Sequence, residues 1–213
     1  MIQYAIRNGA NIMDQSHPYN GSLTAEQFLF YEIRIAAKYY VSDLKIDEAI
    51  ERIKKDNLFQ YPTERQVSRL ARACYKRLDA LGNEQLVHEL ASAPNDIAKQ
   101  INLYAVMRYN RLVWEFMIQV IGEKYRNQDM NFSRKDMNAF FSRLQAQDDS
   151  VAAWSDATIT KIKSVLVRML IETGYLDGLK DTTLNPVFLC EELERGIEAN
   201  NDYDALSAFN YFR

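Results

Sequence analysis

The chain has 213 residues, of which 47% are hydrophobic and 26% are charged, and its formal net charge is −3. This composition is typical of a folded globular protein and excludes both a disordered chain and a small disulfide-stapled scaffold. Only 7 Gly and 4 Pro are present, which is too few turn residues for a sandwich or a barrel. Helix-forming residues are abundant, so we expect an all-α fold.

Capping residues and apolar spacing divide the chain into helices. A capping box at Thr24 and Gln27 predicts that the first helix starts there and ends near residue 41. The most apolar segment, 96–126, is expected to form a buried central helix that breaks near Tyr109. Other caps and stop signals predict helices over 46–55, 64–81, 84–91, 134–145 and 156–173, with closing helices from residue 191 onward.

We expect three parts along the chain. Residues 1–22 are rich in turn formers and form a loosely ordered lead-in. Residues 23–126 form an N-terminal helical unit with a first helix-turn-helix and the central helix. Residues 127–213 form a winged-helix-like unit whose turn-rich segment 177–189 is able to make a short β-hairpin, the wing. Eight acids against two bases over 177–204 predict a solvated acidic tail.

Several classes of protein and site are excluded by what the sequence lacks. Cys74 and Cys190 lie far apart and no signal segment precedes them, which favours the reducing cytoplasm. No apolar run is long enough to span a membrane. His17 and His88 are the only histidines, and neither has a partner at metal-ligand spacing. Phosphate-loop, dinucleotide and nucleophile-elbow motifs are absent, so we expect no metal, cofactor or catalytic site.

The most informative spacing lies in the helix expected over 64–81. Successive residues of a helix turn by about 100°, which places four cations on one narrow face: Arg65, Arg69, Arg72 and Lys76. The opposite face is apolar: Val67, Leu70, Cys74, Leu78 and Leu81. Such a helix suits a polyanion, because each cation reaches a phosphate or a guanine edge. The alternative is an ordinary solvated face, although those usually mix charges of both signs.

A weaker set of polar side chains lies on the helix expected over 156–173. Its polar face carries Thr160, Lys161, Ser164 and Arg168. Hydroxyls interleaved with cations are typical of helices that contact phosphates and bases, and equally of any exposed helix. On the preceding helix, Arg134 and Lys135 lie where a helix-turn-helix would place them against the DNA backbone.

Two other groups of residues have simpler explanations than a site. Arg111 and Glu115 are four residues apart on a helix, so we expect them to pair with each other rather than to act in catalysis. The aromatic residues of the central helix, such as Tyr104 and Trp114, could stack on bases, but their place on the most apolar helix predicts that they belong to the core.

Three strings closely resemble the BrxA family of bacterial BREX (bacteriophage exclusion) phage-defence systems: LFQYPTER at 58–65, ARACYKRL at 71–78 and AKQINLYAVMRYNRLVWEF at 98–116. The resemblance runs from about Tyr19 to the C-terminus. It implies an all-helical protein, similar in part to the NusB antitermination fold, with two helix-turn-helix motifs disposed to grip duplex DNA. The family offers no catalytic motif to carry over, so the assignment of individual cations to DNA rests on their spacing.

Together, the spacing and the resemblance predict a cytoplasmic, monomeric accessory protein that binds double-stranded DNA and has no catalysis of its own. Other BREX proteins, such as the methyltransferase, the ATPase or the phosphatase-like component, are expected partners. One alternative is a helical adaptor whose basic face docks an acidic surface of such a protein. A nuclease is a third, although the acids form no metal-binding motif.

Overall fold

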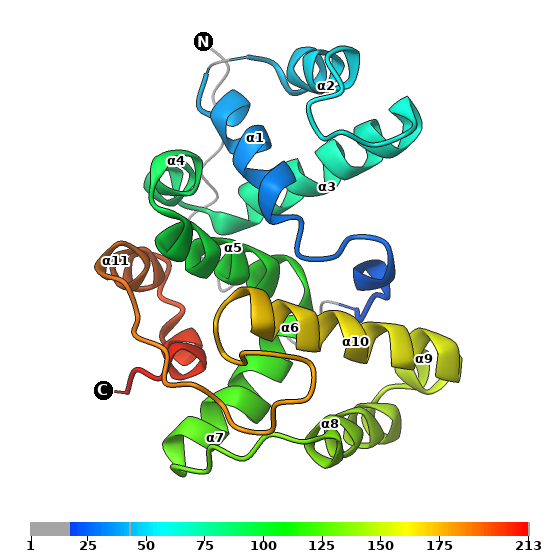
Figure 1. Ribbon diagram of the computed structural model, residues 1–213, viewed down its shortest axis with the longest axis vertical. Coiled ribbons are helices and arrows are strands. Elements are labelled where there is room, and N and C mark those ends of the chain that lie inside the picture. The colour runs from blue at the N-terminus through cyan, green and yellow to red at the C-terminus, as the bar shows by residue number, and fades with distance from the viewer. Residues whose placement is uncertain (1–17, 43, 213) are drawn as a thin grey trace.

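The computed structural model describes residues 18–42 and 44–212, and within them all regular secondary structure is helical (Figure 1). The all-α class expected from the composition is therefore confirmed. The elements in chain order are η1 (Ser22–Thr24), α1 (Phe30–Tyr40), α2 (Ile46–Lys55), α3 (Glu64–Leu81), α4 (Glu84–Ser92), α5 (Asn95–Tyr109), α6 (Arg111–Phe116), η2 (Met117–Gly122), α7 (Glu123–Arg126), α8 (Arg134–Gln147), α9 (Asp149–Ala152), α10 (Asp156–Glu172), α11 (Glu191–Ala199) and η3 (Tyr203–Phe209).

The central helix has the break that its sequence predicts. All side chains over 101–108 in α5 are buried, as expected of a helix that is apolar on every side. Asn110 then leaves the helical conformation, and its side-chain oxygen accepts a hydrogen bond from the Val113 amide at 3.3 Å, which caps α6. The chain continues through the π-helical segment η2 into α7.

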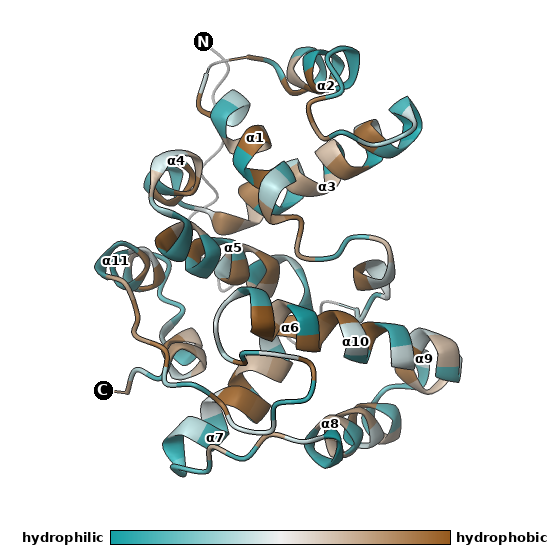
Figure 2. Ribbon diagram, in the orientation of Figure 1, coloured by the Kyte–Doolittle hydropathy of each residue, from teal (hydrophilic) through white to brown (hydrophobic). Residues whose placement is uncertain are grey.

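Other helices surround α5. Helices α1, α3 and α4 pack on one another and on α5, and α2 packs on α3. Helix α10 packs against η1, α11 packs against α4, and η3 packs against η2 (Figure 1). Figure 2 shows hydrophobic and hydrophilic residues alternating along α3 and α10, the pattern of helices with one buried and one exposed face.

A buried polar network fixes the C-terminal segment to α5. The Arg108 guanidinium donates to Asp202 at 2.6 Å and to the Ala80 carbonyl at 2.6 Å. The Tyr104 hydroxyl also donates to Asp202 at 2.6 Å, and Asn200 donates to that hydroxyl at 3.0 Å. Because these groups satisfy one another's hydrogen bonds, Asp202 is buried, and the tail is not wholly solvated as expected. Four apolar residues of η3 are buried as well: Ala205, Leu206, Ala208 and Phe209.

The predicted start of the first helix is wrong. Thr24 belongs to the short turn η1, and α1 begins only at Phe30, after Leu29 adopts a left-handed conformation with φ of +53°. The reason is a long-range contact. The buried Arg77 guanidinium binds the backbone carbonyls of residues 26–28 at 2.5–3.0 Å and keeps this stretch out of the helix.

The wing hairpin over 177–189 does not form within the described residues. This segment pairs instead with the chain before α8, through one antiparallel bridge between Asn131 and Thr183. The Phe132 amide donates to the Thr182 carbonyl at 2.8 Å. The segment contains Pro186 and lacks alternating apolar residues, so it has little capacity to pair with itself.

The lead-in is ordered where it meets the core. Residues 1–17, including His17, lie outside the described part. Tyr19 is buried, its hydroxyl donates to Glu115 at 2.8 Å, and the Arg111 guanidinium stacks over its ring at 4.2 Å. Arg111 and Glu115 pair with each other at 2.7 Å, as predicted.

Candidate nucleic-acid interface

Helix α3 presents the cationic face that its sequence predicts. It begins at Thr63, whose hydroxyl accepts a hydrogen bond from the Gln66 amide at 3.3 Å, and it ends at Gly82 in a left-handed conformation. The apolar face is buried in the core: Val67, Leu70, Cys74, Leu78 and Leu81. The opposite face is exposed: Arg65, Arg69, Arg72 and Lys76.

Most of this charge is not neutralised locally. Arg72 lies 3.6 Å from Asp47 of α2, and both side chains are more than half exposed. Within the described residues, Arg65, Arg69 and Lys76 make no ion pair. A solvated ion pair such as Arg72–Asp47 contributes little to stability, so a polyanion can readily take the place of Asp47.

Arg77 belongs to the same basic run but not to the exposed face. Its side chain is 1% exposed and binds backbone carbonyls of the segment before α1. Burial also lowers its pKa from the ordinary value. This arginine therefore serves the fold.

A second group of cations stands at the start of α8. Ser133 and Asp136 form a capping box there, and Arg134 and Lys135 are exposed in the first turn. Burial tends to raise the pKa of Asp136, but hydrogen bonds from Lys124 at 2.9 Å and from Ser133 outweigh it and hold that pKa below its ordinary value. The acid is thus engaged within the fold, and the two cations face solvent.

Helix α10 carries the third group. Ser155 caps it by accepting from the Thr158 amide at 3.2 Å. The predicted polar face is exposed throughout: Thr160, Lys161, Ser164 and Arg168. The Ser164 hydroxyl donates to the Thr160 carbonyl at 2.9 Å. The neighbouring Lys163 points to α8, where it donates to Asn138 at 2.8 Å and so ties the two helices together.

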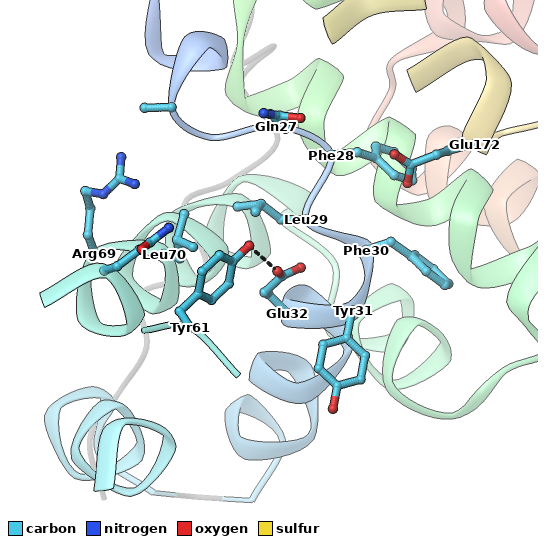
Figure 3. A pocket seen from close by; sticks show the side chains of 12 residues that line it. Gln27, Phe28, Leu29, Phe30, Tyr31, Glu32, Tyr61, Arg69, Leu70 and Glu172 are labelled. Atoms are coloured by element: carbon cyan, nitrogen blue, oxygen red, sulfur yellow. Dashed lines mark hydrogen bonds between the residues drawn. The ribbon is translucent and has the colours of Figure 1, made fainter. Parts of the chain in front are cut away.

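A hollow of about 480 Å³ links α3 to the end of α10. Figure 3 shows Arg69 on one side of it and Glu172 on the other. The Tyr61 hydroxyl donates to Glu32 at 2.7 Å on its wall, and burial together with that carboxylate raises the pKa of Tyr61 to about 12. Burial likewise raises the pKa of Glu172.

Local sequence patterns do not predict this hollow, because four segments that lie far apart in the chain line it: residues 25–32 at the start of α1, Tyr61, α3 and the end of α10. Of the ten predicted residues, Arg69 is the one that lines it. In Figure 1, α3 and α10 both run from right to left, and η1 and the segment before α1 lie between them.

Other kinds of site find no support in the described part of the chain. No group of three or more His, Cys, Asp and Glu residues is arranged to hold a metal ion. His88 is exposed on α4. None of the helices described is long and apolar enough to cross a membrane.

Comparison with known proteins finds a family model and related proteins that carry the same name. The family model named BrxA matches residues 17–201. A protein of Bacillus cereus strain H3081.97, named BREX protein BrxA, is 32% identical over 79% of this chain and 84% of its own length. A protein of the same name from Escherichia coli O9:H4 strain HS is 22% identical over 93% of each chain.

The fold is shared with a solved structure. A crystal structure of an uncharacterized protein from Magnetospirillum magneticum superposes with a TM-score of 0.78 and 19% identity, covering 90% of this chain and 97% of the other. The same helical architecture is thus found at a level of identity where sequences alone are hard to align.

Proposed function

This chain belongs to the BrxA family, and from that premise we propose that it is a non-catalytic accessory component of a BREX phage-defence system that binds double-stranded DNA. The DNA contacts come from the cations and hydroxyls of α3, α8 and α10. Its partners would include other BREX proteins, such as the methyltransferase, the ATPase or the phosphatase-like component, and it would act as a monomer in the cytoplasm.

One observation carries this proposal. The ten residues chosen by spacing are all exposed, and among the described residues Arg72 is the only one of their cations in an ion pair. The cations of such a face repel one another when no acids lie between them. Binding to DNA relieves this repulsion, and the protein's cations release the counterions that are condensed on the phosphates.

The helix order supports two helix-turn-helix units. Helix α2 is followed by a turn and α3, and α8 is followed by the short α9 and α10. In such motifs the second helix enters the major groove and the first crosses the backbone. This would place α3 and α10 in the groove, with Arg134 and Lys135 of α8 on phosphates.

The test uses a random-sequence 20-base-pair duplex and two triple variants. Replacing Arg65, Arg69 and Arg72 by Gln should lower DNA affinity at least tenfold in fluorescence anisotropy, because three phosphate or base contacts are lost. The matched control removes three exposed cations from elsewhere: Arg126→Gln, Lys180→Gln and Arg195→Gln. This control should bind like the wild type.

The same assay separates the rival functions. An adaptor that docks its basic face on an acidic protein would show no affinity for the duplex at moderate salt, and that result would refute the proposal. Cleavage of the duplex with added Mg²⁺ would instead identify a nuclease. Equal loss of affinity in both triple variants would mean that net charge, and not the α3 face, governs binding.

A further inference from the structure

The segment between α10 and α11 presents an aromatic side chain to solvent. Phe188 is 82% exposed, more than the other exposed large hydrophobic residues of the described chain. Its neighbours differ: Val187 is buried, and Leu189 packs against the core. Burying a phenylalanine ring stabilises a folded protein, so the chain gains nothing from holding this ring in water.

The backbone at Phe188 is held in place. Gln100 of α5 donates its amide to the Phe188 carbonyl at 2.9 Å and accepts from the Cys190 amide at 3.0 Å. One side chain thus bridges both sides of Leu189 and fixes the direction of the loop. Earlier in the segment, the Tyr125 hydroxyl donates to the Asn185 carbonyl at 2.5 Å. Because this backbone is already ordered, binding at Phe188 does not have to order the loop.

The sequence on both sides of Phe188 is acidic. Over 177–198 the chain has six acids and two bases, Lys180 and Arg195, and Arg195 is already paired with Glu191 at 2.9 Å. The first turn of α11, directly after Phe188, contains Glu191, Glu192 and Glu194. In Figure 1 this helix lies at the left of the molecule, whereas α3 and α10 begin at the right.

The acidic charge next to Phe188 determines which class of molecule can bind this surface. DNA is excluded because its phosphates would meet carboxylates. A second copy of the chain is disfavoured because a two-fold interface would bring the same acids face to face. A basic protein surface with an apolar pocket satisfies both features, since the ring fills the pocket and the glutamates face the surrounding cations.

We propose that Phe188, with the glutamates of α11, is the docking site for a basic protein partner of the same BREX system, and that the ring is its anchor. This site is separate from the candidate DNA faces and does not depend on them. The molecule would then hold DNA with one side and a protein with the other.

The test uses the proteins encoded in the same BREX system, purified one at a time and titrated against this chain by biolayer interferometry. One of them should bind, and Phe188→Ser should weaken that binding at least tenfold, as expected of an aromatic anchor. Glu191→Lys with Glu192→Lys should weaken it as well and reduce its salt dependence. Tyr31→Ser, which removes an aromatic ring that is 54% exposed on α1, is the matched control and should have no effect.

Each contrary outcome overturns the proposal. These are the absence of binding by every purified protein, and equal effects of the Phe188 and Tyr31 variants. Sedimentation showing a dimer that Phe188→Ser dissociates would assign the ring to a second copy instead. Thermal unfolding and duplex affinity of the Phe188 variant should match the wild type, so failure here is distinguishable from failure of the DNA-binding proposal.

Discussion

Arg69 and Arg77 lie on the same helix and have opposite surroundings. Arg69 is exposed at the mouth of the hollow, and Arg77 is buried with three backbone carbonyls as partners. The planar guanidinium is suited to both tasks, because its fork of donors binds either phosphate oxygens or several carbonyls at once. The surroundings, and not the residue type, therefore decide which arginine is available to a ligand.

The first prediction tests the structural role of Arg77. Arg77→Lys keeps the charge but loses the fork, and it leaves buried carbonyls unsatisfied at a cost of about 2 kcal/mol. For a chain of this size, each kcal/mol shifts the melting temperature by about 2–4 °C, so calorimetry should show a fall of about 4–8 °C. Duplex affinity at 15 °C should not change. A normal melting curve with weakened DNA binding would place Arg77 in the interface instead.

At the scale of the element, local signals suffice where a helix is capped by its own neighbours. Thr63 and Ser133 start α3 and α8 as predicted from the sequence. Thr24 has a similar signal but does not start a helix, because Arg77, 49 residues beyond Phe28, binds the backbone carbonyls of residues 26–28. Helical periodicity predicts which cations are exposed, but the hollow depends on which segments meet, and that information is not local.

The second prediction concerns the capping box of α8. The pKa of Asp136 is lower in the folded chain than in the unfolded one, so its ionised form stabilises the fold above about pH 4. That stabilisation is lost as the pH falls through the folded-state pKa. Asp136→Asn should cost about 1 kcal/mol at pH 7, and the difference from the wild type should vanish near pH 2.

Urea unfolding at several pH values measures this difference. The matched control is Asp181→Asn, which removes an exposed acid in the segment after α10. It should follow the wild-type curve throughout. A constant difference between Asp136→Asn and the wild type from pH 7 to pH 2 would contradict the assignment, because the cost would then be independent of ionisation.

At the scale of the whole molecule, size limits the DNA footprint. A compact chain of 213 residues has a radius of gyration of about 17 Å and a width of about 45 Å. This is comparable with one helical turn of DNA, about 34 Å. Two basic helices on one such body reach adjacent groove segments without a dimer, so we expect a monomer to cover about 10–15 base pairs.

The third prediction tests whether both faces act together. Lys161→Glu with Arg168→Glu should weaken binding as the α3 variant does, because each face alone loses the advantage of an intramolecular second contact. On duplexes of 8 to 20 base pairs, the wild-type affinity should reach a plateau at about 10–15 base pairs, and each variant should lose this length dependence. Lys180→Glu with Arg195→Glu is the control. If only one face matters, or if binding requires a dimer in sedimentation, the two-armed monomer is wrong.

The central claim is that α3 and α10 hold DNA through charge, and the salt dependence of duplex affinity tests it most directly. With five or six cations on phosphates, the slope of log affinity against log KCl should be about −4.5 to −5.5. The Arg65, Arg69 and Arg72 variant should lose up to about 2.7 of that slope, at about 0.9 for each contact. The Arg126, Lys180 and Arg195 control should retain all of it. A wild-type slope near zero, or an equal slope in all three proteins, would contradict the account.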